Sequence, residues 1–273
     1  MIRQPAVAGS FYSASPEALA ADLSQYMPRT AAPQAAIAMV SPHAGLMYSG
    51  HVAGAVYARV IIPGTAILIG PNHSGLGPPI SVYPQGSWLI PGDSVPVDAD
   101  LAETLLAKLP QAKADTSAHL CEHCLEVQLP FLRRARNDVR IVPILLGAVS
   151  LELCRQLGAC LARIILDHSP PGGGAAGPLL IASTDLTHYE PDQVARMKDR
   201  QAIAAIERLD PTALSAAVRE QGIAMCGFAP TMTVLHAARA LGATTGTLVR
   251  YATSGDISHD RTSVVGYAGL TIA

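Results

Sequence analysis

Five side chains able to bind a metal or move a proton occupy positions where an α/β fold brings loops together. His43, His73, Asp185 and His188 each follow a segment predicted to be a buried strand, and Cys226 precedes a predicted helix. Imidazole nitrogens bind borderline metals, and a thiolate at a helix start is favoured by the helix dipole. Cys226 could be a third ligand or a small buried hydrophobe, and spacing does not decide between them. The sequence predicts one metal-binding pocket built from distant loops.

The other cysteines and histidines are expected to be structural. Cys121-Glu122-His123-Cys124 has half of a zinc-knuckle pattern, but no second Cys-x-x-Cys pair completes it. His123 and Glu126 are expected to cap a helix rather than line the edge of the pocket. Core packing is expected for Cys154 and Cys160, and surface or helix roles are expected for His51, His119, His168, His236 and His259. Phosphate-binding, dinucleotide-binding and serine-hydrolase motifs are missing from the sequence.

The predicted elements that must position these residues alternate along the chain. Buried strands are expected at 35–40, 66–70, 139–146 and 178–182, and later strands at 247–252 and 262–271, separated by a turn at 254–256. Helices are expected at 18–27, 50–60, 99–108, 126–136, 151–166, 192–208, 211–219 and 230–241. The Pro- and Gly-rich stretch 170–177 is interpreted as a surface loop. The pattern predicts an α/β fold, a three-layer αβα sandwich around a mostly parallel central sheet that becomes mixed near the last strands.

Length and composition restrict the class of protein. A chain of 273 residues, 49% hydrophobic and 15% charged, folds around a large core, and we expect a single α/β domain over 1–273. The formal net charge of -2 argues against nucleic-acid and membrane partners. No signal peptide or long apolar run is present, and five cysteines do not suggest a disulfide framework. We therefore expect a soluble, cytoplasmic protein with reduced thiols.

Six segments, in order along nearly the whole chain, carry a family resemblance. They are Arg3 to Tyr12, Pro42-His43-Ala44-Gly45-Leu46-Met47-Tyr48-Ser49-Gly50, Gly70-Pro71-Asn72-His73, Glu122 to Pro130, Ser183-Thr184-Asp185-Leu186-Thr187-His188-Tyr189, and Cys226-Gly227. By these motifs the chain resembles the Memo family, whose bacterial and archaeal members are called component B of the AmmeMemoRadiSam system. The resemblance implies an AMMECR-type protein and a radical SAM protein as partners.

The fold of that family is similar to that of LigB-type class III extradiol dioxygenases, which are non-haem iron enzymes. The resemblance implies that His43 and His73 are metal ligands and that Cys226 takes the place of a glutamate. It also implies that His188 is an acid–base residue, with Asp185 orienting it or supplying another ligand. The implied cofactor is a divalent metal, with iron favoured and copper or zinc as alternatives. Animal members have a histidine where this chain has Gln128.

Three functions are compatible with this pocket. The first is a metal-dependent, dioxygenase-like oxidoreductase whose substrate the sequence does not define. The second is a non-catalytic module that binds a small molecule, a peptide or a partner protein, as the signalling role of animal relatives implies. The third is a copper- or redox-handling protein in which Cys226 is an exposed thiol of low pKa.

Overall fold

Four buried parallel strands form the centre of the protein. The computed structural model describes residues 1–28, 31–168 and 177–273. In it β2 (Ala38–Ser41), β9 (Leu179–Ser183), β3 (Thr65–Pro71) and β8 (Arg140–Leu146) lie side by side in that order, all parallel. Nearly every residue of these strands is buried. Strands covered on both faces need such continuous apolar sequences, which is why these segments were predictable.

Antiparallel strands extend this centre into a mixed, nine-stranded sheet. On one side β12 (Val264–Ile272) pairs antiparallel with β2, and β10 (His188–Glu190) and β11 (Gly246–Thr253) pair with β12. On the other side β4 (Ile80–Val82) is antiparallel to β8, and β7 (Ala112–Ala114) is parallel to β4. A separate three-stranded sheet contains β1 (Ile2–Arg3), β5 (Ser87–Ile90) and β6 (Asp93–Pro96), which the sequence did not predict.

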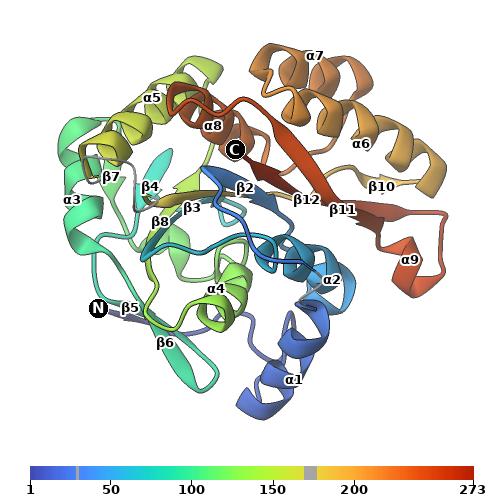
Figure 1. The fold of residues 1–273 in the computed structure, drawn as a ribbon, viewed down its shortest axis with the longest axis horizontal. Helices are drawn as coiled ribbons and strands as arrows, with labels where there is room; N and C mark the ends of the chain where they lie inside the picture. The colour runs from blue at the N-terminus through green and yellow to red at the C-terminus, as the bar shows by residue number, and fades with distance from the viewer. Residues whose placement is uncertain (29–30, 169–176) are drawn as a thin grey trace.

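Helices cover both faces of the large sheet, so the predicted α/β sandwich is confirmed. One face carries α1 (Pro16–Tyr26), α2 (Leu46–Tyr57) and α4 (Leu129–Ala135), and these lie below the sheet in Figure 1. The other face carries α3 (Ala99–Lys108), α5 (Leu151–His168), α6 (Asp192–Glu207), α7 (Pro211–Gln221) and α8 (Phe228–Ala240). Alternate residues of β2 reach opposite cores: Val40 packs in the α5 and α8 core, and Met39 in the α2 and α4 core.

Local differences from the predicted elements are small. The helix expected at 126–136 begins as a 3-10 turn, η2 (Glu126–Gln128), before α4, and a second 3-10 turn, η1 (Ser117–His119), precedes it. The turn expected at 254–256 leads into a short helix, α9 (Gly255–Ser258). The loop expected at 170–177 lies outside the described residues apart from Gly177.

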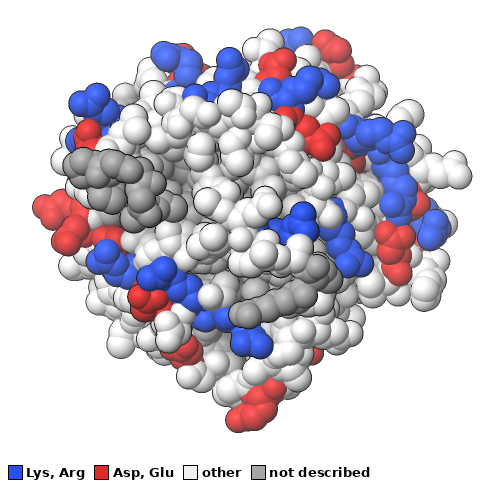
Figure 2. All heavy atoms as spheres, viewed as in Figure 1, with Lys and Arg blue, Asp and Glu red and all other residues white. Residues whose placement is uncertain are grey.

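Surface charge is spread over both signs. On the face in Figure 2, Lys and Arg atoms lie close to Asp and Glu atoms around the margin, and much of the centre is uncharged. Among the described residues, no helix has the length and apolar character needed to cross a membrane.

Candidate metal centre

His43 is fixed by the ends of two parallel strands. It lies two residues beyond β2, is buried, and donates its backbone N–H to Asp185 Oδ1 at 2.8 Å, beyond the end of β9. Its ring nitrogen Nδ1 lies 2.9 Å from Ser183 Oγ, and Nε2 lies 3.2 Å from Cys226 Sγ. Burial, followed by the neighbouring imidazoles of His123 and His73, holds the pKa of His43 well below its ordinary value. The ring is therefore neutral near pH 7, as a metal ligand must be.

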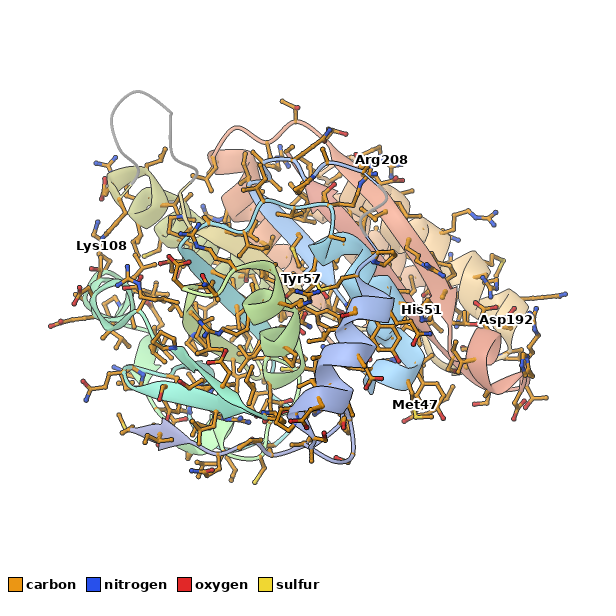
Figure 3. All side chains as sticks on the ribbon, turned by 60° about the horizontal axis from the view of Figure 1, so that its bottom comes forward. Met47, His51, Tyr57, Lys108, Asp192 and Arg208 are labelled. Atoms are coloured by element: carbon orange, nitrogen blue, oxygen red, sulfur yellow. The ribbon has the colours of Figure 1, made fainter. Side chains whose placement is uncertain are left out.

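The hydrogen bonds around Ser183 determine which nitrogen of His43 carries the proton. The Ser183 hydroxyl donates its one proton to the Cys124 carbonyl at 2.7 Å, and it accepts from Gln128 Nε2 at 3.0 Å. His43 must therefore donate from Nδ1 to Ser183 Oγ, which leaves the lone pair on Nε2. Gln128 is itself held by Tyr57, whose hydroxyl donates to Gln128 Oε1 at 3.0 Å from a position between α2 and α4 (Figure 3). Gln128 is a positioning residue for His43 through this chain of bonds.

His73 is held by a buried carboxylate. Glu122 accepts from the His73 backbone N–H at 2.6 Å and lies 2.9 Å from His73 Nδ1. Burial opposes ionisation of both groups, but their mutual hydrogen bond and charges outweigh it. The pKa of His73 is raised, and that of Glu122 is lowered to about 2. The ionised carboxylate accepts the Nδ1 proton, so His73 would bind a metal through Nε2, an arrangement common for metal-binding histidines.

His123 joins these two imidazoles, so the capping role expected for it is wrong. Its ring stacks on His73 with centroids 4.9 Å apart, and it lies edge-on to His43 at 5.5 Å. Its Nδ1 lies 3.3 Å from the same Glu122 carboxylate. One nitrogen from each of His43, His73 and His123 lies within 4.8 Å of the others. Metal–nitrogen bonds of about 2 Å place ligand atoms at separations inside that limit.

A second group of potential ligands fits a metal less well. His73, Glu122 and Cys124 also have ligand atoms within 4.8 Å of one another. However, the Cys124 thiol is fully buried and donates to the Pro71 carbonyl at 3.1 Å. Burial and then the Glu122 charge raise its pKa well above the ordinary value. The three-histidine group therefore has the more suitable donors.

Cys226 lies beside His43 just before α8, as expected, but the low thiol pKa of the third alternative function is contradicted. Burial and the nearby Asp185 carboxylate raise the pKa of its thiol to about 12, which outweighs the helix dipole. Because His43 Nε2 carries a lone pair, the Cys226 thiol donates to it across the 3.2 Å contact. A metal ion that replaced this proton would face a thiolate and an imidazole lone pair.

Among the described residues, Asp185 makes no hydrogen bond to His188, so the orienting role that the resemblance implied for Asp185 is not seen. The Asp185 carboxylate accepts from the backbone N–H of His43, and burial raises its pKa. The His188 Nδ1 lies 2.7 Å from the Leu186 carbonyl and 2.8 Å from the Ala224 carbonyl, so it donates to both. Backbone carbonyls therefore orient His188 and leave its Nε2 as a proton acceptor, while Asp185 positions the His43 loop.

The loop that carries Glu122 and His123 is fastened by the N-terminal segment. Arg3, which is 1% exposed, donates to the carbonyls of His119 and Glu122 at 2.7 Å each and pairs with Glu126 at 2.6 Å. Glu126 also accepts from the backbone of Ala6 and from Tyr12. Glu126 thus anchors the N-terminal segment, and the capping role expected for it is wrong.

His119, for which a surface or helix role was expected, lies in η1 and not at the surface. It is completely buried, its Nε2 lies 2.9 Å from Ser81 Oγ, and burial lowers its pKa to about 3. Cys154 is buried and Cys160 packs against the same core, as predicted.

An open pocket of about 500 Å³ leads to the histidine cluster. His73 and Cys226 lie on its wall, and the rest of the lining comes from the loops after β3 and β8. The remaining lining residues are Pro71, Asn72, Gly75, Gly77, Pro78, Pro79, Leu146, Gly147 and Ala148. A small molecule could reach the candidate metal centre by this route.

Sequence reasoning missed Glu122 and His123 because it looked for ligands after strand ends. These residues lie in the irregular segment between β7 and α4. A usable signal was the Cys-Glu-His-Cys sequence itself, in which a histidine and a carboxylate are adjacent.

Comparison with known proteins identifies the family. The profile described as Memo-like protein matches residues 3–271. The chain is 39% identical to a MEMO1 family protein of Methanothermobacter thermautotrophicus, covering 99% of this chain and all of the relative. It is 41% identical to a MEMO1 family protein of Aquifex aeolicus, covering 98% of each. The crystal structure of an uncharacterized protein from Escherichia coli K12 has a similar fold, with a TM-score of 0.58 and 15% identity over 86% of this chain and 99% of that one. The chain belongs to the Memo family.

Proposed function

We propose that this protein is a metal-dependent redox enzyme whose ion is bound by His43, His73 and Cys226, with His123 as a further imidazole. The observation that supports it best is the tautomer of the rings. The Nδ1 protons of His43 and His73 are donated to Ser183 and Glu122, so each ring would bind an ion through Nε2, in place of the Cys226 proton at His43 and of the ring proton at His73. Cys226 Sγ lies 3.2 Å from His43 Nε2, which supports it as a ligand, although the group of three whose ligand atoms all lie within 4.8 Å of one another is His43, His73 and His123.

The donor set favours iron, copper or zinc over magnesium or calcium, and we propose iron. The two nearby carboxylates are occupied, because Glu122 accepts from His73 and Asp185 accepts from the His43 backbone. Imidazoles and a thiolate are borderline to soft ligands. Bound iron would supply a redox centre with open positions for a small substrate.

His188 is the residue we propose for proton transfer. Its Nδ1 proton is donated to the carbonyls of Leu186 and Ala224, so the opposite nitrogen can accept a proton. An electrostatic effect of His188 on the pKa of His43 and of Asp185 supports a role for it near the cluster. An imidazole held in one tautomer is suited to acid–base catalysis.

Metal analysis of protein purified without oxygen tests this proposal. Wild type is compared with a His43→Ala, His73→Ala double variant. A His51→Ala, His236→Ala double variant is the matched control, because those rings belong to neither candidate ligand group. We expect iron near one equivalent in wild type and in the control, and little in the first variant. Equal metal in all three would refute the site, and full occupancy by zinc would refute the redox role, because zinc has no redox chemistry.

A further inference from the structure

A pocket of about 480 Å³ lies at the end of the large sheet where β2 begins, away from the candidate metal centre. Its wall is formed by α2 and the residues just after it, by β11 and by the last residues of β12. Because β12 runs antiparallel to β2, its Ile272 lies beside Ala38, the first residue of β2. The candidate ligand His43 follows the opposite end of β2, so the pocket and the metal centre are separate.

Two arginine side chains, Arg59 and Arg250, line this pocket, and its wall contains no aspartate or glutamate among the described residues. Both arginines are exposed, and neither guanidinium forms a hydrogen bond or an ion pair within the described part of the chain. The terminal carboxylate of Ala273, also in the wall, accepts from the backbone N–H groups of Thr244 and Thr245 at 2.8 and 3.1 Å. Two positive charges therefore share one pocket without an acidic side chain to neutralise them.

A β-bulge in β11 turns Arg250 toward the pocket. The register between β11 and β12 shifts between Leu248 and Arg250. Leu248 and Tyr251 pack against the α5 and α8 core, whereas Val249 packs against the α2 and α4 core. In a regular strand Arg250 would share the face of Leu248, but the extra residue at the bulge leaves it on the α2 side. Burial, followed by the charge of Arg250, lowers the pKa of His51 on α2 (Figure 3), which agrees with a guanidinium on that side.

Two hydroxyl groups and a small residue complete the wall. Thr247 and Thr271 are paired across β11 and β12, and both line the pocket. Thr271 lies between Leu270 and Ile272, which pack in the α5 and α8 core, so its own side chain faces the α2 side. Neither threonine hydroxyl has a partner among the described residues. Ala55 of α2 has a short side chain and leaves room beside these donors.

We propose that this pocket binds a small phosphorylated molecule whose phosphate group lies between Arg59 and Arg250. A phosphate monoester carries a charge of about −1.5 to −2 near pH 7, which two guanidinium groups neutralise. Its three terminal oxygens accept from guanidinium N–H pairs and from hydroxyls, which are the donors in this wall. A carboxylate, with one charge and two oxygens, would leave part of these donors unpaired. The pocket volume lies in the range of small-molecule sites, so the ligand carries an organic part beside its phosphate.

Calorimetry with ethyl phosphate, a small phosphate monoester, tests the site, and propionate is the carboxylate probe. Arg59→Gln and Arg250→Gln each remove one guanidinium. Arg134→Gln is the matched control, because Arg134 is also exposed and without an ion pair among the described residues, but belongs to α4 and not to the pocket. We expect wild type and Arg134→Gln to bind ethyl phosphate equally and more tightly than propionate. Each of the other variants should lose roughly tenfold or more in affinity.

Two further measurements locate the bound phosphate and its source. The His43→Ala, His73→Ala variant should bind ethyl phosphate as wild type does, so failure of the metal centre is distinguished from failure of this pocket. Sedimentation with phosphatidylcholine vesicles that contain phosphatidic acid distinguishes a lipid headgroup from a soluble ligand. The proposal is overturned if wild type does not bind ethyl phosphate, if it binds only the vesicles, if the three arginine variants have equal affinity, or if binding requires His43 and His73.

Discussion

Replacement of Glu122 by glutamine tests how the candidate ligands are oriented. The carboxylate accepts four N–H groups: those of the His73 backbone at 2.6 Å and ring at 2.9 Å, and the backbone N–H groups of His123 at 2.9 Å and Cys124 at 3.0 Å. An amide NH2 in place of either oxygen must face at least one of these donors. The variant therefore leaves a buried N–H without an acceptor.

The magnitude follows from those bonds. An orphaned buried N–H costs about 1–3 kcal/mol, and the remaining bonds lose their charge assistance. We expect Glu122→Gln to reduce the free energy of unfolding by about 2–4 kcal/mol. Since His73 would no longer be held by a charged acceptor, we expect the Fe(II) affinity to fall about 10- to 100-fold. Urea unfolding measures the first quantity, and anaerobic titration against a competing chelator measures the second.

Glu126→Gln is the matched control. Glu126 is as buried as Glu122 and also accepts four bonds, from Arg3, Ala6, Val7 and Tyr12, but none from an imidazole. Its loss leaves the Arg3 guanidinium buried and unpaired, which costs about 3–5 kcal/mol. We expect lower stability, with a smaller loss of Fe(II) affinity than in Glu122→Gln. If both variants lose the same affinity, or Glu122→Gln loses none, the orienting role of Glu122 is wrong.

Two further predictions concern packing and pH. A Cβ added at Gly227 would overlap Thr184 Cβ and the Ser183 carbonyl. We therefore expect Gly227→Ala to lower the free energy of unfolding, measured in urea, by about 1–3 kcal/mol. Because Cys226 would be displaced, Fe(II) binding should also weaken. Gly147→Ala, whose nearest contact would be 3.8 Å, should be neutral, and equal effects at the two positions would contradict the packing argument. The Arg196 guanidinium holds the pKa of Asp192 below its ordinary value of 3.8. The ion pair therefore stabilises the fold fully above about pH 3.8, and this stabilisation is lost as Asp192 becomes protonated at lower pH. We expect Arg196→Gln to lower the free energy of unfolding by about 1–2 kcal/mol at about pH 7, and by less at about pH 3. A difference in stability between variant and wild type that does not change with pH would contradict the ion-pair origin.

The central fold could be predicted because its signals are local. Helix α3 begins and ends at the predicted residues because Asp98 caps it, with its side chain accepting from the Leu101 N–H. The strands β3, β8 and β9 are unbroken apolar segments between turn residues. By contrast, β1 has two residues and β7 has three, too few to show a period of two.

Candidate site residues could be predicted from the sequence where they follow the ends of sheet strands, and not where they lie in irregular loops. The proximity of His43 and His73 could be predicted because parallel strands end at one edge of the sheet. His123 was not found, because Arg3 and Glu122 fix its loop through contacts more than a hundred residues apart in sequence. The raised pKa of Cys226 was missed for a different reason: desolvation depends on neighbours that a helix-start signal does not reveal.

The position of β12 has a consequence for how the protein is made. This strand is formed by residues 264–272 yet lies inside the sheet, where its Leu270 pairs with Val40 of β2. During synthesis, β2 can pair with β12 only after more than two hundred further residues have been made. Until then one edge of β2 is unpaired and open to other chains. Ribosome stalling or a premature stop near residue 260 should yield aggregates rather than a shortened, folded protein.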